Sequence, residues 1–143
     1  MQIKTINENY KNYLLVEQEE INKWSKGFFI EMLTQKNVYF FSTRKPTEGY
    51  LIARKIFNDY EILALATSKL KRRQGLAVNL LNNLIKKAKK NKIKKILLEV
   101  SKNNQAAIKL YSKLGFNKAG ERKKYYKTTT GWLDAEIMSK VIT

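Results

Sequence analysis

The sequence predicts an α/β fold with a mixed central sheet of about six to seven strands, flanked by about four helices. Two observations support this prediction. A buried strand over residues 60–67, an amphipathic helix from about Gly75 and a second buried strand over residues 96–100 form a unit whose length implies a right-handed parallel crossover. Two β-rich segments near the end, residues 116–123 and 133–139, are typical of antiparallel strands, so both kinds of pairing are expected in one sheet.

The first part of the chain predicts one short strand and two helices. Residues 1–6 alternate as a strand does, and Asn7 can cap a helix that follows. Ser25 is the expected cap of the second helix, which residues 35–37 end. The apolar stripes comprise Tyr10, Tyr13, Leu14 and Ile21 in the first helix, and Phe28, Phe29, Met32 and Leu33 in the second.

Two β-rich segments follow, residues 38–42 and 49–55. The turn between them holds the only proline, Pro46, so the pair is expected to form a hairpin. Later, Asn104 is the expected cap of a helix that Gly115 ends. The long helix before it carries one apolar stripe, made of Leu76, Leu80, Leu81, Leu84, Ile85 and Ala88.

Length and composition predict one domain over residues 1–143, because the chain is long enough to bury a core and 43% of it is hydrophobic. It contains no cysteine and no histidine. Disulfides, thiolate nucleophiles, serine–histidine pairs and histidine-bound zinc are therefore excluded, and no metal site is expected. No segment has the ~20 apolar residues of a membrane span, and the first residues lack the apolar core of a signal peptide. A cytoplasmic protein without a membrane partner is the expectation.

The net charge of +17 has two interpretations. Lysines gather at the end of the long helix, where they complement the helix dipole, and no aromatic residues are interleaved to stack on bases. A solvated face is therefore favoured over a nucleic-acid groove, although a polyanion such as the ribosome would still be attracted non-specifically. The lysines concerned are Lys86, Lys87, Lys89, Lys90, Lys92, Lys94 and Lys95.

A basic turn with one glycine joins the strand at residues 60–67 to the long helix. The first N–H groups of a helix have no partner within it, and the glycine lets a ligand approach the backbone, so the turn can cradle a phosphate. Taken alone, such a turn is more often a solvated helix end. Its residues are Arg72, Arg73, Gln74, Gly75, Leu76 and Ala77.

Two further side chains can carry chemistry. Glu99 lies inside the apolar run of residues 96–100, where a carboxylate is costly to bury unless it faces a cleft, and such a position suits a general base. The alternative is an outward-facing residue paired with a lysine. Tyr111 lies near the core face of the helix that follows Asn104, where an aromatic residue is usually a packing residue.

The order of these motifs resembles the GNAT acetyltransferase superfamily. Within it, the match from about residue 61 to residue 138 is similar to the bacterial ribosomal-protein alanine N-acetyltransferases (RimI). The segments that carry the resemblance are Leu98-Glu99-Val100, residues 104–108, Leu110-Tyr111, residues 114–117, Tyr125-Tyr126 and residues 134–138.

The resemblance implies a single GNAT-like domain that transfers acetyl from acetyl-CoA to the N-terminal amine, alanine by analogy, of a small-subunit ribosomal protein. Glu99 would be the base and Tyr111 the acid in a direct transfer. Trp24, Tyr125 and Tyr126 would line the acceptor groove, with plain packing as their alternative role. The residues implied to hold acetyl-CoA are Leu65, Ala66, Thr67, Arg72, Arg73, Gln74, Gly75, Leu76, Ala77, Val78 and Asn104.

Three departures bear on the acceptor pocket more than on the reaction. Ala77 replaces the last glycine of the phosphate turn, Ala64 replaces an asparagine of the RimI pattern, and residues 68–71 lack its Asp-Pro. Two other functions stay open. One is acetylation of a lysine side chain or a small-molecule amine on the same scaffold, and the other is a basic ribosome- or RNA-binding module without catalysis.

Overall fold

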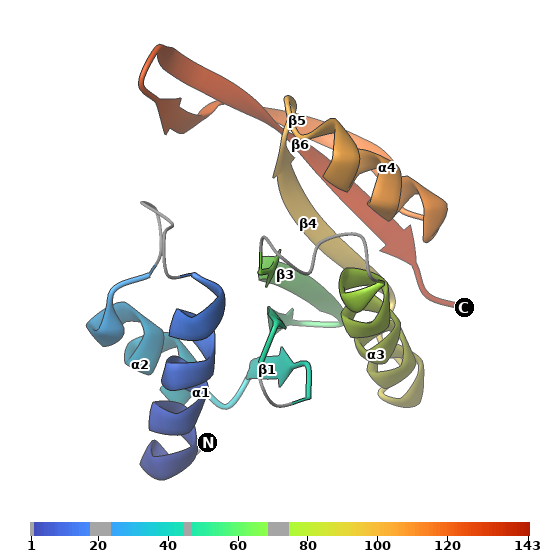
Figure 1. The fold of residues 1–143 in the computed structure, drawn as a ribbon. Coiled ribbons are helices and arrows are strands. Elements are labelled where there is room, and N and C mark those ends of the chain that lie inside the picture. Colours follow the sequence, from blue (N-terminus) through green and yellow to red (C-terminus); the bar gives the residue numbers. More distant parts are fainter. Residues whose placement is uncertain (1, 18–23, 45–46, 69–74) are drawn as a thin grey trace.

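The computed structural model describes residues 2–17, 24–44, 47–68 and 75–143, and of residue 126 only the backbone (Figure 1). In chain order the elements are α1 (Ile3–Val16), α2 (Lys26–Thr34), β1 (Val38–Ser42), β2 (Gly49–Ile56), β3 (Asp59–Thr67), α3 (Leu76–Lys90), β4 (Lys95–Ser101), α4 (Gln105–Lys113), β5 (Asn117–Thr128) and β6 (Gly131–Val141).

The described strands form one six-stranded sheet in the order β1-β2-β3-β4-β6-β5. β3 and β4 pair in parallel, whereas the other neighbours are antiparallel. The predicted α/β fold with a mixed sheet is therefore confirmed.

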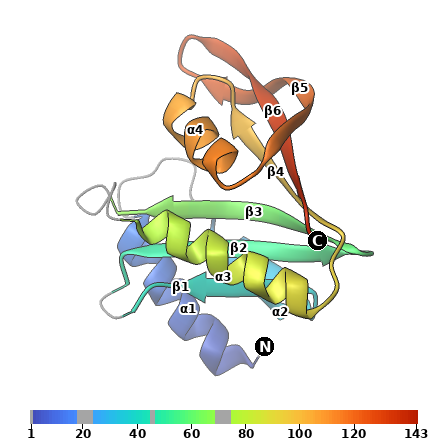
Figure 2. The ribbon, with the colours of Figure 1, turned by 90° about the vertical axis from the view of Figure 1, so that its right-hand side faces the viewer.

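Helices cover both faces of the sheet. α1 and α2 lie on one face, and α3 and α4 lie on the other (Figures 1 and 2). Each pair encloses its own core. Leu81 and Leu84 of α3 are fully buried against the strands, and Phe29 and Leu33 of α2 are fully buried on the opposite face.

The predicted strand over residues 1–6 is wrong, because α1 already begins at Ile3 and is preceded by Gln2 as its cap. Asn7 therefore lies inside the helix and does not cap it. Helical spacing explains the result: Ile6 and Tyr13, seven positions apart, are both almost fully buried on the same side of α1. Residue 1 and Ile21 lie outside the described residues.

The next elements follow the sequence closely. The Ser25 hydroxyl accepts a hydrogen bond of 3.2 Å from the backbone N–H of Phe28, which confirms the predicted cap. β1 has the predicted bounds, and β1 and β2 pair as an antiparallel hairpin. Pro46, in the predicted turn, lies outside the described residues.

The lysine-rich end of α3 is largely a solvated face. Lys86, Lys89 and Lys90 are exposed, whereas the ammonium of Lys87 lies 4.6 Å from the centre of the Tyr39 ring. Within the described part of the chain, no helix is long and apolar enough to span a membrane.

The strands at the end of the chain are longer than predicted. Tyr125 and Tyr126, expected in the connection, belong to β5. The actual turn is short because the Thr128 hydroxyl donates a hydrogen bond of 2.8 Å to the carbonyl of Gly131. Both strands therefore extend beyond the ends that the apolar pattern predicts.

Candidate active site

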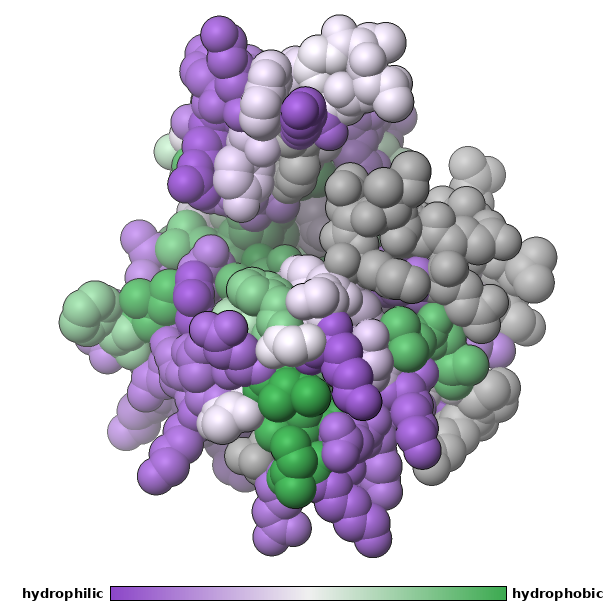
Figure 3. Space-filling view, turned by 90° about the vertical axis from the view of Figure 1, so that its left-hand side faces the viewer, coloured by the Kyte–Doolittle hydropathy of each residue, from purple (hydrophilic) through white to green (hydrophobic). Residues whose placement is uncertain are grey.

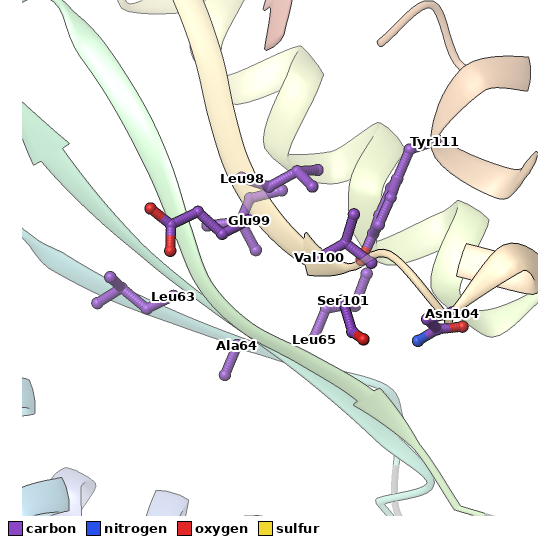
Figure 4. A pocket seen from close by; sticks show the side chains of 10 residues that line it. Leu63, Ala64, Leu65, Leu98, Glu99, Val100, Ser101, Asn104 and Tyr111 are labelled. Carbon is purple, nitrogen blue, oxygen red and sulfur yellow. The ribbon is translucent and has the colours of Figure 1, made fainter. Parts of the chain in front are cut away.

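A cavity of about 290 Å³ opens where β3 and β4 separate. Their parallel pairing ends at Ile62 and Leu98, although β3 continues to Thr67 and β4 to Ser101. The two strands therefore diverge and leave a wedge between them (Figure 4). The residues that line it are Ile62, Leu63, Ala64, Leu65, Leu98, Glu99, Val100, Ser101, Asn104 and Tyr111.

The diverging part of β3 offers a backbone edge to this wedge. Its other edge is taken by β2, which pairs with it as far as Thr67. An extended ligand can form strand-like hydrogen bonds at such an edge. Of the residues predicted to do so, Leu65 lines the cavity, whereas Ala66 and Thr67 lie further along the strand.

The first turn of α3 lies beside the same end of β3 (Figure 2). Gly75 adopts a left-handed conformation, with φ of 77°, and α3 starts directly after it without a side-chain cap. No acidic side chain occupies the first turn, which leaves the N–H groups of Leu76, Ala77 and Val78 suited to an anion. Arg72, Arg73 and Gln74 lie outside the described residues.

Glu99 reaches the cavity from the middle of β4, with a side chain that is 23% exposed. One nitrogen of Arg122, Nη1, donates to both of its carboxylate oxygens, at 2.9 and 3.2 Å. Both interpretations of Glu99 thus hold in part, since it faces a cleft and is paired with a cation, although that cation is an arginine. Arg122 also lies 4.5 Å from the centre of the Tyr125 ring.

Tyr111 reaches the cavity from α4 and is only 8% exposed. Its ring packs against Phe116 at 5.8 Å between centroids, so it is a core residue and a cavity residue at once. Asn104 precedes α4, where its Oδ1 accepts from the backbone N–H of Ala107 at 3.2 Å. Its Nδ2 lies on the cavity side (Figure 4).

Glu99 and Tyr111 lie on opposite sides of β4 (Figure 4). Alternation along the strand explains this: Leu98 and Val100 are buried on the side of Tyr111, and Glu99, between them, points the other way. A titratable side chain is therefore available for proton transfer on each side of β4.

The residues predicted to contact the acceptor are spread more widely. Tyr125 is 42% exposed, and its hydroxyl pKa is raised by burial, and then by the charge of Glu99 and a hydrogen bond with it. Trp24 packs on Phe28 at 4.9 Å and donates its backbone N–H to the Tyr13 hydroxyl at 2.6 Å. The structure thus brings Tyr125 to Glu99 and places Trp24 in an aromatic cluster near α2, while the side chain of Tyr126 lies outside the description.

Comparison with known proteins decides the family. The model of the acetyltransferase (GNAT) family matches residues 9–116. The chain belongs to this family. It is 32% identical over 132 residues to the ribosomal protein bS18-alanine N-acetyltransferase of Escherichia coli K12. The aligned region covers 92% of this chain and 89% of the relative. An N-alpha-acetyltransferase of Saccharolobus solfataricus is 30% identical over 125 residues, covering 85% of this chain and 74% of that protein.

Solved structures agree. The crystal structure of the Escherichia coli ribosomal-protein-S18-alanine N-acetyltransferase superposes with a TM-score of 0.88 at 29% identity, over 100% of this chain and 91% of that one. This GNAT protein is accordingly an acetyl-CoA-dependent N-acetyltransferase.

The described residues of this GNAT chain fit acetyl-CoA. The uncapped start of α3 suits phosphate groups, the open edge of β3 suits the amide-bearing arm, and the wedge leads from there to Glu99 and Tyr111. In the described ranges, no group of three or more acidic, cysteine or histidine side chains is arranged to hold a metal ion.

Sequence reasoning missed Arg122 and Ser101. Nothing in the local sequence marks them, because Arg122 is one of 29 basic residues and meets Glu99 only through the pairing of β4, β6 and β5. Ala64, noted for departing from the RimI pattern, does line the cavity.

Proposed function

We propose that this enzyme transfers acetyl from acetyl-CoA to the α-amine of an N-terminal alanine on ribosomal protein bS18 or a protein like it. The names of the relatives from Escherichia coli and Haemophilus ducreyi support this acceptor, the latter being 31% identical over 132 residues. The observation that carries the proposal is that Glu99 and Tyr111 line one cavity from opposite sides of β4.

On the acceptor side, Glu99 acts as the general base. An α-ammonium group has a pKa of about 8 and must lose a proton before it can attack a carbonyl. The Glu99 carboxylate takes that proton, directly or through a water molecule. Its side chain is 23% exposed, which leaves part of the carboxylate accessible to an incoming amine. The molecular surface is hollowed on the side of the molecule where α1 and α2 lie (Figure 3).

On the other side, Tyr111 acts as the general acid. Acetyl-CoA supplies an activated acetyl group, and the sulfur that leaves must be protonated. The Tyr111 hydroxyl gives its proton to this thiolate, and the packing of its ring on Phe116 holds it in place. Direct attack of the amine needs no covalent enzyme intermediate and no metal, which suits a chain without cysteine and histidine.

The remaining site assignments belong to the same proposal. The N–H groups at the start of α3, together with Arg72, Arg73 and Gln74, would hold the pyrophosphate of acetyl-CoA, and Asn104 would contact the same molecule. Trp24, Tyr125 and Tyr126 would line the acceptor groove. We also propose that residues 1–143 act as one domain, in the cytoplasm, where the ribosomal acceptor is made.

The test is acetylation of a peptide that copies the N-terminus of ribosomal protein bS18, with mass spectrometry to locate the label. We expect label on the α-amine, and an about 10²- to 10⁴-fold loss of kcat in Tyr111→Phe and Glu99→Gln. Tyr39→Phe, in β1 at the far edge of the sheet, is the matched control and should keep full activity.

Three results would contradict the proposal. Label on lysine side chains alone would indicate a different acceptor class, and full activity of Tyr111→Phe would remove the proposed acid. Absence of any stabilisation by acetyl-CoA in a thermal-shift measurement would instead favour a basic binding module without catalysis.

A further inference from the structure

Arg122 contacts the proposed base across an intervening strand. β6 lies between β4 and β5, so Glu99 and Arg122 are two strands apart in the sheet. Glu99 is opposite Ile137, and Arg122 is opposite Ala135, two residues earlier on β6. Neighbouring strands are about 4.8 Å apart, so the Arg122 side chain crosses β6 to bring Nη1 to both oxygens of Glu99.

Three neighbouring lysines are paired with other carboxylates. Lys102 and Lys118 each lie 2.7 Å from Glu121, and the ammonium of Lys123 lies 3.5 Å from Asp134. Lys123 and Glu121 are two residues apart on β5 and so share the face opposite to Arg122, and the register shift between Lys118 and Gly120 turns Lys118 to that same face. Glu99 therefore receives an arginine although lysines are far more common in this part of the chain.

Tyr125 supports the guanidinium from a second direction. Its ring centre lies 4.5 Å from the guanidinium carbon, a cation–π distance. The cation is thus fixed by a carboxylate and by an aromatic ring, both of which point toward the acceptor side of the sheet. Such double support restricts where the Glu99 carboxylate can turn.

Stability alone does not account for this arrangement. The Arg122 side chain is 55% exposed, and an exposed ion pair contributes little to folding. Its geometry is more specific than its exposure requires: one nitrogen meets both oxygens and so keeps the carboxyl group turned toward Arg122. A carboxylate has about four lone-pair sites, so beside the two contacts with Arg122 and the hydrogen bond with Tyr125 one is left to accept a proton from an incoming amine.

We propose that Arg122 is a positioning residue of the acetyl transfer, which holds the carboxylate of Glu99 in the orientation that receives the proton of the acceptor ammonium. The inference rests on the proposed role of Glu99. Arg122 itself exchanges no proton and touches no reacting atom. Tyr125 contributes to the same positioning, because the contact between its ring and the guanidinium keeps Arg122 close to Glu99.

Arg54 provides a matched control, because it forms a second arginine–glutamate pair in the same sheet. Its Nη2 lies 3.0 Å from Glu61 Oε2, and neither residue lines the cavity. Arg122→Met and Arg54→Met each remove one guanidinium and break one ion pair. Only the first should affect the chemistry.

The experiment measures kcat and the two KM values for Arg122→Met, Arg122→Ala and Arg54→Met, with acetyl-CoA and the bS18 N-terminal peptide. We expect Arg122→Met to lower kcat by about 10- to 100-fold, the usual effect of a misplaced reacting group, with the KM for acetyl-CoA unchanged. Arg54→Met should stay within about twofold of the parent. Added guanidinium ion should restore part of the kcat of Arg122→Ala, because the vacated site is open to solvent, and should not restore Glu99→Gln.

Equal kcat values in the two methionine variants, or a loss confined to the peptide KM, would overturn the proposal and indicate a structural or peptide-binding role. Thermal shift by acetyl-CoA verifies that each variant is folded, and guanidinium rescue gives a readout that misfolding cannot imitate. If Glu99→Gln keeps full activity, the proposed function of Glu99 fails first. If Glu99→Gln is inactive while Arg122→Met is fully active, this inference alone fails.

Discussion

The backbone at Gly75 allows a prediction whose size follows from one angle. Its φ is +77°, and a Cβ added there would meet no atom of the described residues within 4 Å. Gly75→Ala therefore creates no clash with the described part of the chain, and the cost expected from its backbone angle is conformational. A residue with a Cβ loses about 1–2 kcal/mol in the left-handed region. Alanine also lowers the conformational entropy of the unfolded chain, which stabilises the folded protein by about 0.4–1 kcal/mol.

Gly27, in α2, is the control that separates these two contributions. A Cβ added there also meets no atom of the described part of the chain within 4 Å, but its φ is not in the left-handed region. Gly27→Ala should thus stabilise the protein by about 0.4–1 kcal/mol. Subtracting one variant from the other cancels the shared effect on the unfolded chain and leaves the left-handed cost of about 1–2 kcal/mol.

The assay is thermal unfolding of both variants beside the parent. A difference of that size in a chain of 143 residues corresponds to a Tm about 3–6 °C lower for Gly75→Ala than for Gly27→Ala. The Tm of Gly75→Asn should lie between those of Gly75→Ala and Gly27→Ala, because asparagine tolerates the left-handed region better than alanine does. Equal Tm values for the two alanine variants would refute the argument.

The same substitution has a functional consequence. Gly75 sets the direction in which the chain enters α3, and with it the direction of the first N–H groups of that helix. Gly75→Ala should raise the KM for acetyl-CoA more than it lowers kcat, whereas Gly27→Ala should change neither. A fall in kcat alone would mean that the start of α3 does not hold the acetyl donor.

Three further substitutions test separate parts of the fold. Phe57, 91% exposed with φ of 53° in the turn between β2 and β3, is strained without packing in return, so Phe57→Gly should stabilise the protein by about 0.5–1 kcal/mol in thermal unfolding. Leu81→Ala, in the fully buried stripe of α3, should cost about 2–5 kcal/mol in urea unfolding. Hydrogen bonds from Lys102 and Lys118 lower the pKa of Glu121 from 4.5 to about 2, so its contribution to stability is present above pH 4.5 and is lost as the pH falls toward 2. Between these two values the urea midpoint of the parent should therefore fall more steeply than that of Glu121→Gln.

Most of the sheet could be predicted because its strands carry strong local signals. The bounds of β1 were predicted to the residue, and the apolar runs of β3 and β4 were found within one residue of their ends. The segment before Asn7 was predicted wrongly because six residues are too few to separate a period of two from a helical period. Only the burial of Ile6 beside Tyr13 distinguishes a helix from a strand here, and that burial depends on packing against α2 and β2.

The residues of the candidate site also divide into those that the local sequence reveals and those that it does not. Glu99 and Tyr111 could be singled out because each is chemically unusual for its position in the sequence, a carboxylate in an apolar strand and a phenol near a core face. Arg122 could not, because its significance arises from strand order: Glu99 and Arg122 are 23 residues apart and meet only across β6. Trp24 illustrates the reverse case, where an expected groove residue also forms aromatic contacts with Phe28 and Phe29.

The separation of β3 from β4 links the proposed acetyl-donor site to the placement of Glu99 and Tyr111, the two groups proposed to transfer protons. Beyond Leu98, β4 no longer pairs with β3, yet it remains paired with β6 as far as Ser101. Glu99 is the first β4 residue past the last pair with β3, so it is anchored by one neighbouring strand while its other edge borders the cavity. Had the parallel pairing continued by two more residues, the edge of β3 would be closed to a ligand and the path between Glu99 and Tyr111 would be filled by backbone. The divergence thus creates the proposed donor site and exposes the proposed base in a single step, and β6, which holds β4 in register with Arg122 on its far side, sets the position of Glu99.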